Sequence, residues 1–174
     1  MLNLNRCNLT TYLVIAVWFI SVVVGLVYFQ VAQLSDFDRN KLLNEPNWFN
    51  NFKQQVKYEK SNSASLVIVT DPNCGCTIQA KPHLKQLTEF SEQKGVSLIL
   101  LEQSSSLQTV IPSTPAAVVL NKEGEFVYAG PLSEGLGCAQ GSGFVETVIT
   151  NLMAGFNSQL LLNNTKGCYC TTQT

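Results

Sequence analysis

The 174-residue sequence predicts an α/β domain, with a central mixed sheet of about four strands flanked by helices, behind one N-terminal transmembrane helix. Three observations predict this class. A charge-free apolar run covers residues 11–32. After it, apolar runs typical of buried strands alternate with amphipathic helical patterns. A Cys-Gly-Cys pair at 74–76 separates the first strand pattern from the helix that follows it.

The apolar run follows a short N-terminal segment, residues 1–10. About twenty apolar residues at ~1.5 Å each are enough to cross a hydrocarbon core of ~30 Å. Trp18 and Tyr28 lie towards opposite ends of the run, where aromatic side chains suit the membrane interface. A buried core helix and a cleaved signal peptide are the alternatives. The length of the run and the lack of a small-residue cleavage site favour an uncleaved anchor. Residues 33–45 are expected to be a linker.

Location and partners follow from charge and cysteine usage. The charges beside the apolar run barely decide its orientation. Five of the six cysteines lie in the long C-terminal body, which favours export to an oxidising compartment. We therefore expect a single-pass protein of the bacterial inner membrane, with a cytoplasmic N-terminus, a periplasmic body and membrane lipid around its helix. A net charge of −1 without a basic stripe argues against nucleic acid as a partner.

The body, residues 46–156, alternates helical and strand patterns, and a tail of residues 157–174 follows it. The first two strands are joined by a helix and should be parallel with a right-handed crossover, and a hairpin should add an antiparallel edge. The expected elements are a helix at 45–59, a strand at 66–70, a helix at 76–95, a strand at 96–102, hairpin strands at 115–121 and 125–130, and a helix at 144–156.

Three local features resemble the thioredoxin superfamily. Cys74 lies between a buried strand and the helix after it, and Pro82 lies inside that helix, eight residues after Cys74. "Ser113-Thr114-Pro115" opens the hairpin strand, where that family has a cis-proline facing its active-site cysteines. The resemblance covers residues 46–156. More narrowly, the chain resembles membrane-anchored thioredoxin-like proteins of an uncharacterised bacterial group with a Cys-x-Cys active-site variant and a Cys-aromatic-Cys tail.

The sequence departs from the thioredoxin pattern at three places. That family spaces its cysteines as Cys-x-x-Cys, which would put the second one at Thr77, whereas here it is Cys76. Asn73 stands where a tryptophan usually precedes the first cysteine, and Ile68 stands where the preceding strand usually carries a buried acid. Proton transfer through such an acid is therefore not expected.

The resemblance implies thiol–disulfide exchange on thiols and disulfides of envelope proteins. A thiolate attacks disulfides, and the backbone amides at the start of a helix should stabilise the thiolate of Cys74. Cys76 would resolve the mixed disulfide by bonding to Cys74, with Gly75 as a spacer that permits positive φ. The resemblance also implies that Thr114 and Pro115 contact the substrate backbone. No cofactor and no metal is expected for this reaction.

The remaining cysteines leave alternatives open. Five cysteines in the body is an odd number, so at least one is free or pairs between molecules. Cys138, Cys168 and Cys170 are candidates for structural disulfides. One set pairs Cys74 with Cys76, and Cys138 with Cys168 or Cys170. In another set, Cys168 and Cys170 bond to each other and relay electrons to the first pair.

The alternative function is a non-catalytic or metal-binding thioredoxin-like module. Two Cys-x-Cys pairs could supply four thiolates to Zn²⁺ or two to Cu(I). Zinc sites more often space their cysteines by two residues, which argues against this alternative. His83 is the single histidine, and we expect it on the surface of the helix as readily as at a ligand position.

Overall fold

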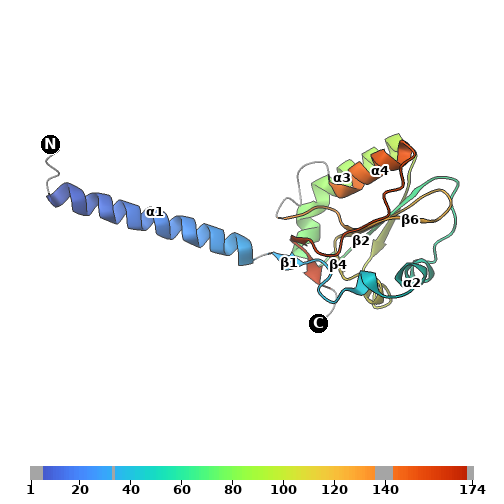
Figure 1. Cartoon of the computed structure of the whole chain (residues 1–174), viewed down its shortest axis with the longest axis horizontal. Coiled ribbons are helices and arrows are strands. Elements are labelled where there is room, and N and C mark those ends of the chain that lie inside the picture. Colours follow the sequence, from blue (N-terminus) through green and yellow to red (C-terminus); the bar gives the residue numbers. More distant parts are fainter. Residues whose placement is uncertain (1–5, 33, 136–142, 172–174) are drawn as a thin grey trace. The chain divides into compact units, whose positions relative to one another are not determined.

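The computed structural model describes residues 6–32, 34–135 and 143–171, and divides the chain into two compact units, Met1–Gln33 and Leu34–Thr174. The first unit holds helix α1, Arg6–Ala32 (Figure 1). Its segment Leu9–Gln30 is long and apolar enough to cross a membrane, and none of it is buried. A membrane anchor and an N-terminal signal sequence both have this length and composition.

The second unit is built on a five-stranded sheet with the order β3-β2-β5-β6-β7. Strands β2 and β3 are parallel, as predicted, and β5 runs antiparallel to both of its neighbours, β2 and β6. The mixed α/β class is therefore confirmed, with five strands in place of about four. The strands are β2 Ser65–Thr70, β3 Ser97–Glu102, β5 Ala116–Leu120, β6 Phe126–Pro131 and β7 Leu160–Leu161.

Helices cover both faces of this sheet, with α3 and α4 on one face and α2 on the other (Figure 1). Alternate residues of β2 serve the two faces, because successive side chains of a strand point in opposite directions. Leu66 and Ile68 pack with α3 and α4, whereas Val67 and Val69 pack with α2. The helices are α2 Trp48–Gln55, α3 Gly75–Lys94 and α4 Phe144–Met153, and the 3₁₀ helices are η1 Leu42–Asn44 and η2 Leu107–Thr109.

The segment expected to be a linker belongs to the compact body from Leu34 onward. Strand β1, Ser35–Asp36, pairs antiparallel with β8, Lys166–Gly167. Phe37 is buried in the core. The buried carboxylate of Asp38 accepts hydrogen bonds from the backbone amides of Leu42 and Leu43 at 2.7 and 2.8 Å. Polarity alone suggested a linker, but Phe37 and Asp38 give this segment a buried ring and an acceptor for the first amides of η1.

The C-terminal tail is also part of the body. Besides β7 and β8 it contains β9, Cys170–Thr171, which pairs antiparallel with β4, Ser113–Thr114. In Figure 1 the last described residues lie beside β1 and β4. The tail therefore returns to the strand that precedes Pro115, far away in the sequence.

Candidate functional site: four cysteines under the C-terminal tail

The first cysteine pair lies where β2 ends and α3 begins. The Cys74 amide donates to the Asp71 carbonyl at 3.0 Å, and the Asn73 amide donates to the Asp71 carboxylate at 2.9 Å. This turn leaves Cys74 as the extended N-cap residue of α3, and its carbonyl accepts from the Ile78 amide at 3.2 Å. Cys74 and Cys76 are therefore held at the start of a helix, where backbone amides lack partners within the helix.

The Thr114–Pro115 peptide bond is cis, the isomer that the sequence resemblance implied. It opens β5, the strand beside β2, so it lies at the same end of the sheet as the start of α3. The sulfur of Cys74 is 3.9 Å from the Thr114 carbonyl oxygen. The predicted site residues Cys74, Thr114 and Pro115 are thus brought together from segments 40 residues apart.

The disulfides differ from both pairings expected from the sequence. Cys74 is bonded to Cys170, and Cys76 is bonded to Cys168, with Cα–Cα separations of 6.0 and 5.6 Å. These separations lie in the ordinary range for disulfides. Neither Cys74–Cys76 nor Cys168–Cys170 is formed, because Cys170 lies opposite Thr114 in the β4–β9 pair and so beside Cys74. Cys138 lies outside the described residues.

The two disulfides differ in accessibility. Cys74 is 2% exposed. Cys76, Cys168 and Cys170 are partly exposed. We call Cys76–Cys168 the outer disulfide, since both of its residues are reached by solvent, and Cys74–Cys170 the inner disulfide. A solute thiol reaches the outer disulfide more readily.

Gly75 does not have the role that its position suggested. It is the first residue of α3, and positive φ occurs at other glycines, among them Gly95 and Gly135, but not at Gly75. A Cβ atom added at Gly75 would have no atom within 4 Å. The position between the two cysteines therefore has a backbone conformation that residues other than glycine can also adopt.

Tyr169, between the two tail cysteines, anchors the tail without a covalent bond. The residue is 8% exposed, and its ring packs edge-on against Phe37, with 5.2 Å between the ring centroids. Its hydroxyl donates to the Ser133 carbonyl at 2.8 Å. Its carbonyl accepts from the Ser35 hydroxyl at 2.9 Å. The sequence reasoning missed this anchor, although an aromatic residue between two cysteines was its visible signal.

The residues that depart from the thioredoxin pattern have local roles. Thr77 is buried, and its hydroxyl oxygen is 3.4 Å from the Asp71 amide, so it supports the turn before the helix. Ile68 is fully buried in the core. The Thr114 hydroxyl is also buried, and no hydrogen-bond partner for it is found in the described part of the chain. Thr114 thus contributes backbone pairing to the site.

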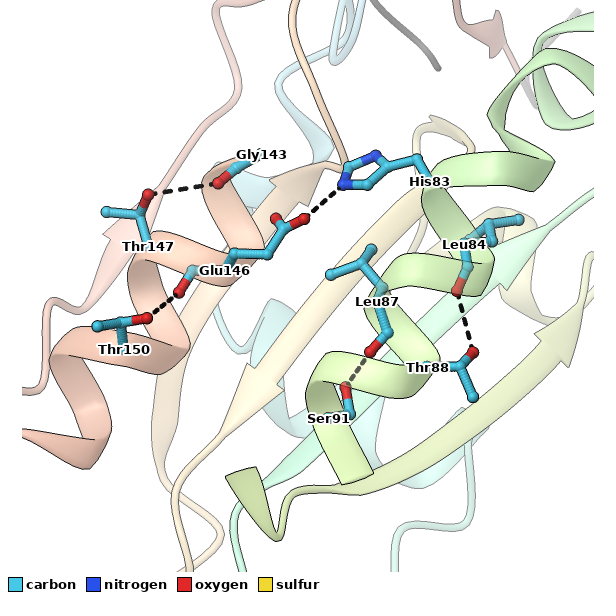
Figure 2. A network of polar contacts seen from close by, with 9 residues as sticks. All are labelled: His83, Leu84, Leu87, Thr88, Ser91, Gly143, Glu146, Thr147 and Thr150. Carbon is cyan, nitrogen blue, oxygen red and sulfur yellow. Dashed lines mark hydrogen bonds and ion pairs between the residues drawn. The ribbon is translucent and has the colours of Figure 1, made fainter. Parts of the chain in front are cut away.

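His83 is a core residue, so neither the surface position nor the ligand position considered from the sequence is confirmed. It is 1% exposed, and its Nε2 lies 2.7 Å from Oε1 of Glu146, so the pair joins α3 to α4 (Figure 2). Gly143 lies directly against it, since a Cβ atom there would come within 2.8 Å of the His83 ring. The clustered potential metal ligands among the described residues are Cys74, Cys76 and Cys170, without His83.

Tyr128 on β6 is fully buried near this pair. Its hydroxyl donates to the Pro131 carbonyl at 2.6 Å. Burial raises the pKa of Tyr128 well above its usual value of 10.0, and the nearby Tyr169 and Glu146 raise it further. The phenol is therefore neutral at physiological pH and acts as a hydrogen-bond donor.

Comparison with known proteins shows similarity in fold without an assigned activity. A search of curated proteins found no similar sequence. An uncharacterised conserved protein from Geobacillus kaustophilus is similar, with a TM-score of 0.54 and 14% identity over 66% of this chain and 79% of that one. The hypothetical protein SMc02350 from Sinorhizobium meliloti 1021 has a TM-score of 0.50 and 12% identity over 65% of this chain and 80% of that one. Residues 45–172 match one family across both cysteine pairs, and the chain belongs to that family, the domain of unknown function DUF6436.

Proposed function

We propose that the chain has a thioredoxin-like fold and, anchored by α1, carries out thiol–disulfide exchange on exported proteins. The observation that carries this proposal is the placement of Cys170. It lies on an extended strand paired antiparallel with Thr114, next to cis-Pro115, and its sulfur is bonded to Cys74. A cysteine of an extended substrate peptide, captured as a mixed disulfide, would have the same relation to these three residues. The tail then acts as an internal partner of the site.

Exchange would begin at the outer disulfide. An external thiolate attacks the sulfur of Cys168, a new mixed disulfide forms with Cys168, and the Cys76 thiolate leaves. If the external molecule carries a second thiol, its thiolate displaces Cys168 and closes a disulfide in that molecule. Two electrons have then passed to the protein, and Cys76 and Cys168 are both reduced. Partial exposure of both residues supports this order.

The inner disulfide can follow without a large movement. The sulfurs of Cys74, Cys76 and Cys170 all lie within 4.8 Å of one another. The Cys76 thiolate attacks the sulfur of Cys170, a Cys76–Cys170 bond forms, and Cys74 leaves as a thiolate. Cys74 is the N-cap residue of α3, and the dipole of that helix favours an anion at its N-terminus. Cys74 is in this way released as a thiolate that can attack a substrate disulfide, and Cys76 is the residue that releases it.

The burial of Cys74 favours a second candidate function. A non-catalytic module would use both disulfides only to staple the tail to the body, and a bond with one sulfur on a residue 2% exposed suits that role. The two functions differ in reduction potential. Structural disulfides have potentials below about −300 mV, whereas exchange proteins lie above that value.

The decisive experiment measures these potentials. The full-length chain in detergent is equilibrated in dithiol–disulfide buffers containing a metal chelator, quenched by alkylation and analysed by mass spectrometry. We expect the outer disulfide to have a potential above about −300 mV. We also expect the oxidised chain to oxidise a dithiol peptide, with Cys7→Ser as the unaffected control. Potentials below that value for both disulfides, or peptide oxidation that persists in a Cys76→Ser/Cys168→Ser/Cys74→Ser variant, would refute the proposal.

A further inference from the structure

We infer that four cysteines, once reduced, form a binding site for one soft, thiolate-binding cation of the Zn²⁺ type. They are Cys74 and Cys76 at the start of α3 and Cys168 and Cys170 in the C-terminal tail. The structure brings two Cys-x-Cys pairs from opposite ends of the body to one place. Thiolate sulfurs are the ligands that Zn²⁺ prefers in closed four-coordinate sites. This inference does not depend on catalysis, since a chain that exchanges disulfides slowly could still bind metal when reduced.

The sulfur positions suit a single ion. Three of them, from Cys74, Cys76 and Cys170, lie within 4.8 Å of one another. Tetrahedral coordination with Zn–S bonds of ~2.3 Å requires sulfurs about 3.8 Å apart. Once reduced, the Cys74 and Cys170 sulfurs would have to separate by about 1.8 Å from their bonding distance of ~2.05 Å. The longest separation in the group would have to shorten by about 1 Å. Cys168 is bonded to Cys76, so its sulfur is the nearest candidate for the fourth ligand.

Reduction would leave the sulfurs together, because the tail is also held by non-covalent contacts. Tyr169 packs on Phe37 and donates to Ser133, and both of these contacts are independent of the disulfides. Backbone pairing of β8 with β1 and of β9 with β4 flanks Tyr169 on either side. A preorganised set of thiols binds a metal without the entropic cost of gathering separate chain segments.

The start of α3 compensates part of the negative charge that accumulates at such a site. Four thiolates around a divalent cation leave a net charge of about −2, and backbone amides at a helix start favour anions. The nearest acid along the sequence, Asp71, directs a carboxylate oxygen to the Asn73 amide at 2.9 Å. The helix start supports the site, and the clustered sulfurs define it.

The electron and proton balance makes the site conditional on reduction. Each disulfide takes two electrons and two protons to become two thiols, so both together consume two equivalents of a dithiol reductant. Metal binding then displaces the thiol protons. No electrons pass to or from the metal. The bound cation would withhold the thiolates from reoxidation, so metal occupancy and disulfide formation exclude each other.

The experiment uses the full-length chain in detergent, reduced anaerobically with a phosphine and titrated with Co²⁺ followed by Zn²⁺. We expect one Co²⁺ per chain, with intense near-ultraviolet thiolate-to-cobalt absorption that Zn²⁺ abolishes. Cys74→Ser and Cys170→Ser should each weaken binding at least tenfold, whereas Cys7→Ser should bind like the parent chain. Circular dichroism of each reduced variant checks that it is folded.

Several results would overturn the inference. A folded, reduced chain that shows no thiolate-to-cobalt absorption would overturn it. So would an absorption that survives in Cys74→Ser/Cys170→Ser, or a loss of Co²⁺ affinity in Cys138→Ser as large as that in Cys74→Ser. A complex that forms only between two chains, detected by light scattering, would also overturn it. The outcome is independent of the reduction potentials, which are measured with a chelator present.

Discussion

Cys170 lies opposite Thr114 in the antiparallel β4–β9 pair, and its sulfur is bonded to Cys74 at the start of α3. The same residue is thus both a strand partner of the cis-proline segment and a disulfide partner of the buried cysteine. The backbone pairing positions the sulfur, and the disulfide closes a loop between residues 96 positions apart. Loss of either interaction should therefore weaken the other.

Peptide mapping should show both disulfides between the same two tryptic peptides. Cleavage after Lys60, Lys85 and Lys166 releases peptide 61–85, which carries Cys74 and Cys76, and peptide 167–174, which carries Cys168 and Cys170. Without reduction these peptides should appear as one species joined by two bonds. A separate peptide 61–85 with an internal disulfide would instead indicate the pairings expected from the sequence. Peptide 167–174 would then be internally bonded in one expected set and joined to the peptide that carries Cys138 in the other.

Double variants assign the individual bonds. Cys76→Ser/Cys168→Ser retains the inner disulfide, so the two peptides should stay joined and no thiol of Cys74 or Cys170 should be alkylated. Cys74→Ser/Cys170→Ser retains the outer disulfide and should behave likewise. Free thiols at the retained positions in either variant, under oxidising conditions, would contradict the pairing.

Gly167→Ala should destabilise the body by about 1–3 kcal/mol, as overpacking of a filled site does. An added Cβ atom would lie 2.5 Å from Cζ and from the hydroxyl oxygen of the Tyr169 ring, so the tail anchor would have to shift. Gly75→Ala is the matched control, because its Cβ meets no atom within 4 Å and its backbone is helical. Urea unfolding of the two variants measures the difference. Equal midpoints would show that Tyr169 does not pack on Gly167.

Glu146→Ala should cost about 1.5–3 kcal/mol of unfolding free energy, the range for a hydrogen bond that involves an ionised group. It leaves the buried ring of His83 without its 2.7 Å partner on α4. Glu146→Gln retains an acceptor and should cost less. Thr150→Ala removes only an exposed hydroxyl, bonded to the Glu146 carbonyl at 2.7 Å, and should stay within about 0.5 kcal/mol of the parent chain (Figure 2). A Glu146→Ala midpoint equal to that of Thr150→Ala would exclude the ion pair as a link between the helices.

Alkaline pH should destabilise the body through Tyr128. Burial, with Tyr169 and Glu146 nearby, raises the pKa of Tyr128 in the folded state above 10.0. The unfolded chain then loses this proton at lower pH than the folded chain does. The stabilisation is fully present below pH ~10 and is lost as the pH rises towards the folded pKa, by at most ~1.4 kcal/mol per pH unit.

Urea unfolding at several pH values from 8 to 11, with free thiols alkylated to prevent disulfide exchange, measures this slope. Tyr128→Phe removes the phenol, together with its hydrogen bond to Pro131, so it should be less stable at pH 8 and should lose stability less steeply above pH ~10. An unchanged slope in Tyr128→Phe would assign the alkaline loss to other groups.

The sequence by itself determined the elements whose causes are local. The β-branched run at 66–70 predicts β2, and helical spacing after Cys76 predicts α3. The cis bond at Pro115 was implied only by the resemblance to the thioredoxin superfamily. The uncharged run predicts a helix of membrane-crossing length, and Leu9–Gln30 has it. These patterns repeat within a few residues, so short-range sterics and burial suffice to produce them.

Only the tertiary structure decided which cysteines meet. The partners of Cys74 and Cys76 lie 96 and 92 residues along the chain. The sequence suggested a Cys74–Cys76 bond and left the partners of Cys168 and Cys170 open. The pairing follows from the register of β9 on β4 and from the anchoring of Tyr169 against Phe37, neither of which has a local signature. The burial of His83 and the fifth strand β7 arise in the same way. Each depends on contacts between distant segments, which the folded chain makes when it buries apolar surface and pairs its backbone groups.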